Sequence, residues 1–212
     1  MEIISVNVSK KNSRLVWLKF TGNILLPLSA DDYVLMHLRK FEPLTDPLFL
    51  EIQSASARFL LTEYSLRQVA ISPKVRVLLS QKLRLYSRKI NQRYQYPEGL
   101  VISLVDSVVD KIEVMGLLDP DSFVEYYLRR HKKQSSVQNN FFLRQLGITN
   151  NTIATDDLDK IKIILQKKYK PADFKDYKTK SKIIAKLYQK GFAVNDIKNA
   201  IDDYLGLLVE YP

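Results

Sequence analysis

Two segments in the second half of the chain share one plan, and this internal repeat constrains the fold more than any other feature. They are FFLRQLGITNNTI (residues 141–153) and IAKLYQKGFAVNDI (residues 184–197). In each, a leucine precedes a glycine by four residues, an apolar residue follows the glycine, and an isoleucine lies six residues beyond it. The two glycines, Gly147 and Gly191, are 44 residues apart. Repetition at this spacing indicates a stacked helical array, in which each unit buries its apolar face against its neighbour.

The glycines of the repeat are expected to end helices. The residue just beyond a helix commonly takes the left-handed conformation, which glycine adopts without steric cost. Gly147 and Gly191 are therefore predicted to have positive φ. Asn150 and Asn195 are predicted to cap the helices that follow, because a side-chain oxygen can accept from the free N–H groups of a first turn.

Apolar residues recur at helical spacing from Glu51 onward. One long helix is expected to bury Ile52, Ala55, Phe59, Leu66 and Val69. Another stripe, Val101, Leu104, Val105, Val108, Ile112 and Met115, predicts a single helix over residues 101–115. Further helices are expected at residues 73–90, 120–133, 136–146, 156–169, 177–190 and 194–208.

The first fifty residues have a different pattern. The runs IISVNV, RLVWLKF and NILLPL are short and rich in β-branched or aromatic residues, and Gly22-Asn23 between the last two marks a tight hairpin. A short helix is expected from Ser29, as its N-cap, to Lys40. The prolines of FEPLTDPLF then predict a linker.

These patterns predict a mainly α fold. We expect elongated tandem three-helix repeats, three units in all, preceded by a small N-terminal β segment. The expected segments are residues 1–48 (β hairpin or meander plus a short helix), 51–118, 119–154 and 155–212 (the three helical repeats).

Positive charge is clustered along the chain, whose formal net charge is +10. Residues 74–93 hold seven basic side chains and no acid, and residues 126–155 hold five and again no acid. Such clustering indicates a polyanionic partner, although lysine-rich helix faces can also be merely solvated. The candidate binding residues are Lys82, Arg84, Arg88, Arg129, Arg130, Lys132, Lys133, Arg144, Lys186 and Lys190.

The stretch GLLDPDSFVEYYLRRHKKQSS (residues 116–136) tests whether any acids and histidines form a catalytic or metal site. Asp119 precedes Pro120, which is well tolerated at the first position of a helix, so Asp119 is expected to be the N-cap. Asp121 adds negative charge to the first turn, where the helix dipole favours it. His131 lies at the opposite end of the same helix. The acids therefore have structural roles, and only the basic residues remain unexplained.

The rest of the chain offers no catalytic constellation. Cysteine is absent, G-x-S-x-G and a glycine-rich phosphate loop are absent, and Asp156, Asp157 and Asp159 are expected to be capping acids. The residues therefore predict a binding protein without enzymatic activity or a metal site. No apolar run is long enough to cross a membrane and no signal-peptide pattern opens the chain, which predicts a cytoplasmic protein.

Three motifs together resemble the RecX family of regulatory proteins. They are GLLDPDSF (116–123), LRQLGI (143–148) and KLYQKGFAVNDI (186–197), in the family's order and at compatible spacing. The motif of the first repeat is degraded to RQVAISPKVRVLL, where Ser72 remains but Lys74 replaces the expected glutamate. Pro120 replaces the second aspartate of the middle motif. The resemblance covers about residues 50–206.

The resemblance implies a curved array of three-helix repeats that lies in the groove of the RecA–single-stranded DNA filament. It further implies inhibition of the filament's ATPase and strand exchange, and modulation of DNA repair and the SOS response, with no cofactor. The expected partners are the RecA filament and single-stranded DNA, with double-stranded DNA as a further option. The protein is expected to be a monomer.

Two alternatives stay open. Tyrosines and phenylalanines lie among the charges (Tyr86, Tyr94, Tyr96, Tyr126, Tyr127, Phe141 and Phe142), and these either stack on bases or fill the core. The protein is otherwise an autonomous DNA-binding helical regulator, in which one helix enters a major groove. The polar residues for that role are Gln134, Gln138, Asn139 and Asn140.

Overall fold

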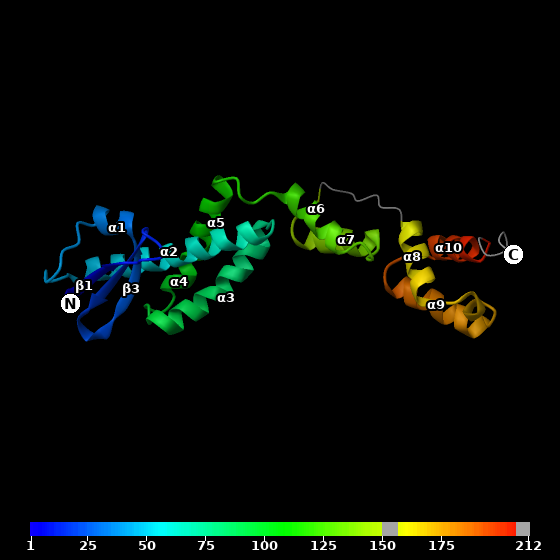
Figure 1. Ribbon diagram of the computed structural model, residues 1–212, viewed down its shortest axis with the longest axis horizontal. Helices are drawn as coiled ribbons and strands as arrows, with labels where there is room; N and C mark the ends of the chain where they lie inside the picture. The colour runs from blue at the N-terminus through cyan, green and yellow to red at the C-terminus, as the bar shows by residue number, and fades with distance from the viewer. Residues whose placement is uncertain (150–156, 207–212) are drawn as a thin grey trace. The chain divides into compact units, whose positions relative to one another are not determined.

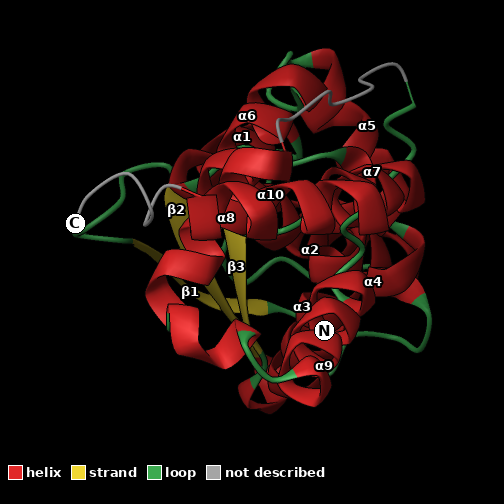
Figure 2. Cartoon of the chain, turned by 90° about the vertical axis from the view of Figure 1, so that its right-hand side faces the viewer, coloured by secondary structure: helices red, strands yellow, loops and turns green. Residues whose placement is uncertain are grey.

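Helices make up most of the chain, and strands lie only near its amino terminus within the residues that the structure describes, 1–149 and 157–206. This architecture, seen in a computed structural model, confirms the predicted fold class of helices preceded by a small β segment (Figures 1 and 2). The chain divides into two compact units, Met1–Pro120 and Asp121–Pro212.

The first unit opens with a three-stranded antiparallel sheet. Its strands are β1 (Ile3–Val8), β2 (Leu15–Phe20) and β3 (Leu25–Ser29), which lie side by side in that order. Alternate residues of β2 are buried while Trp17 is half-buried, as expected for a sheet with one face on the core. The predicted hairpin is present between β2 and β3, where Gly22 has a φ of 80°.

Helix α1 (Ala30–Leu35) begins where the sequence predicts. The Ser29 hydroxyl accepts a hydrogen bond from the Asp32 N–H at 2.9 Å, which makes Ser29 the N-cap. The predicted end at Lys40 was wrong. The helix stops before His37, whose φ of 50° lies in the left-handed region and cannot continue an α-helix.

Two long helices, α2 (Asp46–Ile71) and α3 (Arg76–Tyr94), form the body of the first unit, and α2 packs against β3 and α3. The predicted linker ends earlier than expected. Pro47 lies in the first turn of α2, where a missing N–H leaves no helical hydrogen bond unmade.

The stripe over residues 101–115 forms two helices rather than the predicted one. They are α4 (Leu100–Ser103) and α5 (Val105–Val114), which meet at Leu104. Met115 was also wrongly predicted to be buried, because it is 52% exposed at the end of α5. Val109, which the stripe omitted, is fully buried.

The second unit contains five α-helices within its described residues: α6 (Pro120–Arg130), α7 (Ser136–Gln145), α8 (Asp157–Lys168), α9 (Tyr177–Gln189) and α10 (Val194–Gly206). A short 3-10 turn, Pro171–Phe174, precedes α9. Helix α6 begins directly after Asp119, as predicted. The helices α8 to α10 enclose one apolar core, which includes Ile161, Leu165, Leu187, Phe192, Ile197 and Ile201.

The repeated glycines end helices in the predicted way. Gly147 and Gly191 have φ values of 80° and 79°. Beyond each glycine an N–H reaches back to the leucine of the motif: Ile148 donates to the Leu143 carbonyl at 3.0 Å and Phe192 donates to the Leu187 carbonyl at 3.3 Å. This is the Schellman arrangement, and it explains why the motif pairs a leucine with an apolar residue beyond the glycine.

Of the two predicted asparagine caps, only Asn195 lies within the described residues. Asn195 lies inside the first turn of α10, which begins at Val194, so that prediction was wrong. Asn150 and Asp156 lie outside the described residues.

Candidate functional site

All ten predicted binding cations are exposed on the surface. Three of them, Lys82, Arg84 and Arg88, lie on α3 of the first unit. The other seven lie in the second unit, on or beside α6, α7 and α9: Arg129, Arg130, Lys132, Lys133, Arg144, Lys186 and Lys190.

Part of this charge is engaged within the protein. Arg84 lies 3.6 Å from the Asp106 carboxylate, and Arg130 lies over the Tyr126 ring at 5.5 Å and donates to its hydroxyl. Arg129 and Lys132, by contrast, form no ion pair with any residue of 1–149 or 157–206. The same holds for Lys133, Arg144, Lys186 and Lys190, so their charge is available to a partner.

A hydrogen bond joins the loop after α6 to the end of α9. The Ser135 hydroxyl donates to the Lys190 carbonyl at 2.9 Å. Lys133 is two residues from Ser135, a separation that spans at most about 7 Å. The bond therefore brings two groups of predicted cations together, and we call Arg129, Lys132, Lys133, Lys186 and Lys190 the basic junction.

Gly191 makes this approach possible. A Cβ atom at that position would lie 2.7 Å from the Ser135 hydroxyl and 3.2 Å from a side-chain carbon of Gln138. Ser135 is fully buried and also caps α7, because its hydroxyl accepts from the Gln138 N–H at 3.2 Å. One buried serine thus fixes the start of α7 and the end of α9.

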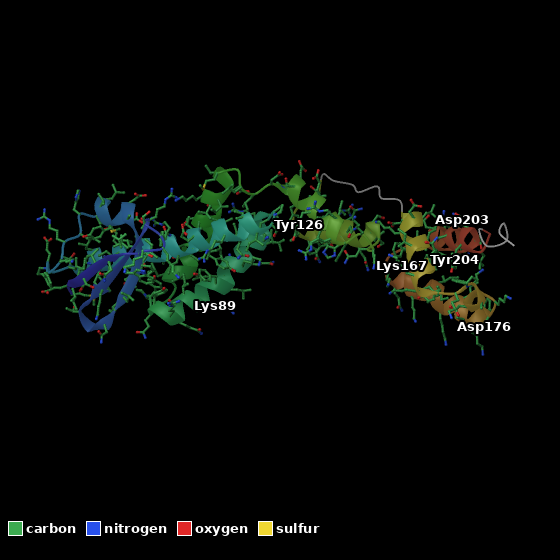
Figure 3. The ribbon with its side chains drawn as sticks, in the orientation of Figure 1. Lys89, Tyr126, Lys167, Asp176, Asp203 and Tyr204 are labelled. Carbon is green, nitrogen blue, oxygen red and sulfur yellow. The ribbon has the colours of Figure 1, made fainter. Side chains whose placement is uncertain are left out.

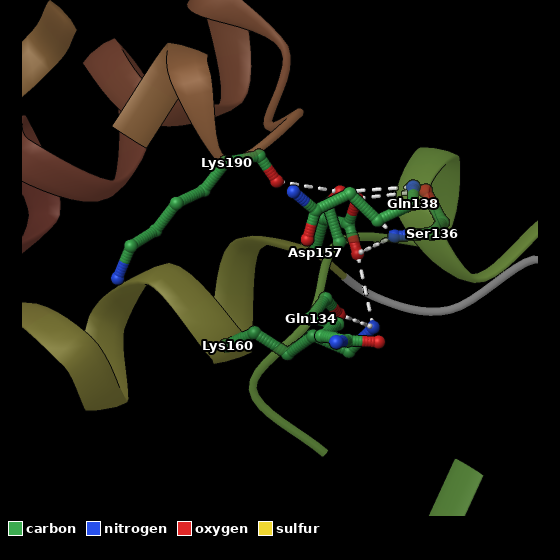
Figure 4. Close-up of polar contacts among 7 residues, drawn as sticks. Gln134, Ser136, Gln138, Asp157, Lys160 and Lys190 are labelled. Carbon is green, nitrogen blue, oxygen red and sulfur yellow. Dashed lines mark hydrogen bonds and ion pairs between the residues drawn. The ribbon is translucent and has the colours of Figure 1, made fainter. Parts of the chain in front are cut away.

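A second set of contacts holds the same loop against α8 (Figure 4). The Asp157 carboxylate accepts from the Ser136 hydroxyl at 2.7 Å and from its N–H at 3.0 Å. The Lys160 ammonium lies 3.1 Å from the same carboxylate and donates to the Gln134 carbonyl at 3.0 Å. In Figure 4 the Lys190 side chain extends away from Asp157, so this acid leaves the Lys190 charge unneutralised.

Asp157 was predicted to be a capping acid, and its carboxylate binds the first residue of another helix, α7. Burial acts to raise the pKa of this carboxyl, but the hydrogen bonds from Ser136 and the nearby Lys160 ammonium outweigh it. The pKa is therefore lowered, and Asp157 stays ionised in the folded protein.

A hollow of about 500 Å³ opens beside the carboxyl end of α9. Its lining is Lys168, Tyr169, Lys186, Leu187, Gln189 and Lys190. Three of these residues are positive and none is negative, so the hollow favours an anionic group such as a phosphate or carboxylate. The Tyr204 hydroxyl of α10 donates to the Tyr169 carbonyl at 3.0 Å and secures the chain after α8 (Figure 3 labels Lys167 and Tyr204 on these helices).

Two of the seven aromatic residues considered for base stacking are buried, four are half-buried and one is exposed. Tyr96 is 4% and Tyr127 is 8% exposed, and Tyr127 stacks on Phe142 at 4.8 Å between ring centres. Tyr86 stacks on Tyr64 at 4.1 Å. Phe141 is 64% exposed and is therefore accessible to a partner.

The residues proposed to recognise base edges are also largely engaged in the fold. Asn139 is 1% exposed, and the Gln134 side chain accepts from the Tyr127 hydroxyl at 2.9 Å. The α7 helix therefore offers fewer polar side chains to a DNA groove than the sequence indicates.

Sequence reasoning missed Lys168, Ser135 and Lys160. Lys168 ends an ordinary-looking lysine-rich helix, and its place in the hollow depends on how α8 and α9 pack. Ser135 could have been recognised as an N-cap, because Gln138 follows three residues later in the capping-box pattern. Its bond to Lys190 spans 55 residues and has no local signal.

Within residues 1–149 and 157–206, no group of three or more histidine, aspartate or glutamate side chains is placed to hold a metal ion. In the same part of the chain, no helix has both the length and the apolar character required to span a bilayer.

Comparison with known proteins found a matching family model and a solved structure of similar fold. The model of the RecX third three-helix domain matches residues 155–201, which correspond to α8, α9 and the first part of α10. A crystal structure of regulatory protein RecX has a similar fold, with a TM-score of 0.60 and 17% identity over 95% of this chain and 98% of that chain. No curated protein sequence matches the chain.

The matched residues 155–201 include the motif at residues 186–197, whereas the motifs at residues 116–123 and 143–148 lie outside them. At 17% identity the structural likeness shows the fold, and the family match assigns the α8–α10 unit. The resemblance to RecX noted in the sequence is thus supported: residues 155–201 match the third three-helix domain of RecX, and the chain has the fold of a regulatory protein RecX.

Proposed function

We propose that the protein binds the RecA–single-stranded DNA filament, inhibits its ATPase and recombination activities, and thereby modulates DNA repair and the SOS response. It acts as a monomer in the cytoplasm and needs no cofactor. The basic junction, together with Arg144 and the hollow at α9, supplies the main binding surface, and Lys82 and Arg88 of the first unit make separate contacts with the same partner.

The observation that carries the proposal is the Ser135–Lys190 hydrogen bond. It holds two groups of unpaired lysines together, although lysines of like charge repel. Holding the two groups of lysines close together is electrostatically unfavourable unless a bound polyanion neutralises both groups. A nucleoprotein filament offers phosphates and acidic protein side chains, and either would suit this surface.

The proposal is tested by sedimentation of the protein with RecA filaments. Four mixtures are compared: RecA alone, single-stranded DNA alone, both together, and both with a nucleotide that is not hydrolysed. We expect the protein to pellet strongly with the assembled filament and weakly with either component alone. Equal binding to free DNA would instead favour an autonomous DNA-binding regulator, and binding to none would refute both functions.

Salt dependence provides a second check on the same complex. Each strand phosphate that the protein neutralises should steepen the log–log slope of affinity against salt by roughly 0.7. A slope near zero would mean that the cations of the basic junction do not contact the filament.

A further inference from the structure

A second hollow lies in the first unit, between the β2–β3 turn and the carboxyl end of α3. Its volume is about 400 Å³. Its walls combine aromatic rings, amide side chains and one cation, with no acidic residue: Trp17, Gly22, Asn23, Ile24, Leu25, Gln53, Arg93, Tyr94 and Gln95. This chemistry differs from that of the lysine-lined hollow at α9.

Gln53 is the most informative residue of the wall. It is 8% exposed, and no residue of the described chain forms a hydrogen bond with its side-chain amide. Other buried polar side chains in this unit do have partners: Ser56 bonds Tyr96 at 2.7 Å, and Ser65 donates to the Leu61 carbonyl at 2.8 Å. The Gln53 amide is not among the fully buried unpaired polar atoms of the described chain, so the exposed part of this side chain reaches the hollow, where its amide is available to a ligand.

The aromatic residues and the arginine add a stacking surface and a positive charge. Trp17 and Tyr94 are both half-buried, so part of each side chain is covered by the fold and part is accessible. The Arg93 guanidinium lies 5.3 Å from the centre of the Tyr94 ring and is exposed. Flat apolar rings beside a cation suit a planar ligand that carries a negative group.

Two wall residues have unusual backbone conformations. Asn23 and Gln95 have φ values of 62° and 53°, in the left-handed region that residues other than glycine seldom adopt. Such conformations persist only where the surrounding structure holds them, and they are frequent at binding sites. Here they set two further amide-bearing residues on the rim of the same hollow.

We propose that this hollow binds one base of a single-stranded nucleic acid. The base stacks on Trp17 or Tyr94, its edge bonds the Gln53 amide, and a neighbouring phosphate lies near Arg93. An amide carries both a donor and an acceptor, which is the combination that base edges present. The site belongs to the first unit and does not depend on the filament or on the basic junction.

Trp17 makes the proposal directly measurable, because it is the one tryptophan in the sequence. The full chain, without RecA, is titrated with a thymidine oligomer of about fifteen nucleotides, within the usual site sizes for single strands. An abasic oligomer of equal length and thymidine monophosphate are titrated in parallel. We expect saturable quenching of Trp17 emission by the thymidine oligomer, and little by the other two ligands.

Substitutions then separate base recognition from attraction to phosphate. Gln53→Leu should weaken the quenching titration about tenfold, as expected when one buried hydrogen bond is lost, without changing its salt slope. Gln81→Leu, an exposed amide on α3 outside the hollow, is the matched control and should bind like the unmodified protein. Arg93→Gln, at an exposed position that tolerates change, should instead make the salt slope shallower by roughly 0.7.

Three results would overturn the proposal. Equal quenching by the abasic oligomer would mean that only the phosphate backbone is bound. Quenching by thymidine monophosphate alone would assign the hollow to a free nucleotide. Unchanged titrations of both Gln53→Leu and Arg93→Gln would show that the hollow is not the site. None of these results bears on filament binding, which is measured by sedimentation with RecA.

Discussion

Replacing Gly191 by alanine should destabilise the second unit much more than the same replacement at Gly147. Both glycines have left-handed φ values, so alanine introduces backbone strain of about 1–2 kcal/mol at either position. At Gly147 a new Cβ would meet no atom within 4 Å. At Gly191 it would lie 2.7 Å from the Ser135 hydroxyl, which must therefore move.

Movement of that hydroxyl removes two interactions. The bond to the Lys190 carbonyl is lost, and so is the N-cap of α7, which contributes about 1 kcal/mol on its own. The lost hydrogen bond to Lys190 adds about 1 kcal/mol. Adding the backbone strain, we expect Gly191→Ala to lower the free energy of unfolding by about 3–4 kcal/mol, against about 1–2 kcal/mol for Gly147→Ala.

Urea unfolding of the full chain can assign this loss to one unit. Trp17 fluorescence reports the first unit, while far-ultraviolet circular dichroism reports helices in both. Gly191→Ala should move the circular dichroism transition to lower urea and leave the Trp17 transition in place. Ser135→Ala in the same background should be non-additive, because the two residues are in contact.

Equal stabilities of the Gly191→Ala and Gly147→Ala proteins would refute this account of the contact. A shift of the Trp17 transition by the same amount would also refute it, because the effect would then not be confined to the second unit.

Two further predictions concern buried polar groups. The lowered pKa of Asp157 gives stability that is present above the ordinary carboxyl pKa and lost as pH falls through the lower folded value. Between about pH 6 and pH 3 the unmodified protein should therefore lose more stability than Asp157→Asn, measured by urea titrations at each pH, and parallel losses would contradict this. Tyr96→Phe should cost about 1–3 kcal/mol because it leaves the buried Ser56 hydroxyl without its 2.7 Å partner. Adding Ser56→Ala should restore part of that loss in thermal melts, whereas a further loss of equal size would argue against the contact.

Features that depend on local chemistry could be predicted from the sequence. The left-handed glycines, the Ser29 cap and the start of α6 all follow from residues within one turn of the feature. The motif was nevertheless recognised in only two places. Gly116 has a φ of 70°, and Leu117 donates to the Ile112 carbonyl at 3.3 Å, so the end of α5 is a third Schellman arrangement. Its residues depart from the repeated motif, because Ile112 stands in place of the leucine and Ser122 in place of the isoleucine.

Features that depend on contacts distant in sequence could not be predicted in this way. The spacing of apolar residues over 101–115 predicts one continuous helix and does not indicate the break between α4 and α5 at Leu104. The position of Asp157 against Ser136 and the bond from Ser135 to Lys190 join different helices. The unpaired amide of Gln53 is likewise visible only after its helix is packed. The candidate cations were identified from the sequence, but which of them lie together was not.

The basic junction carries the central claim, and a matched pair of charge reversals tests it. One variant is Arg129→Glu/Lys132→Glu/Lys133→Glu, and the control combines Arg14→Glu with the same change at Lys10 and Lys11, which lie in the exposed turn between β1 and β2. Both alter the net charge equally and leave the buried core unchanged.

The decisive measurement is inhibition of the filament ATPase by the unmodified protein and by these two variants. We predict that the junction variant needs at least about tenfold more protein for half-inhibition and shows a shallower salt dependence, since each lost phosphate contact removes roughly 0.7 from the slope. The control should inhibit like the unmodified protein. Equal inhibition by a well-folded junction variant, or equal loss in both variants, would contradict the assignment of the basic junction as the filament-binding surface.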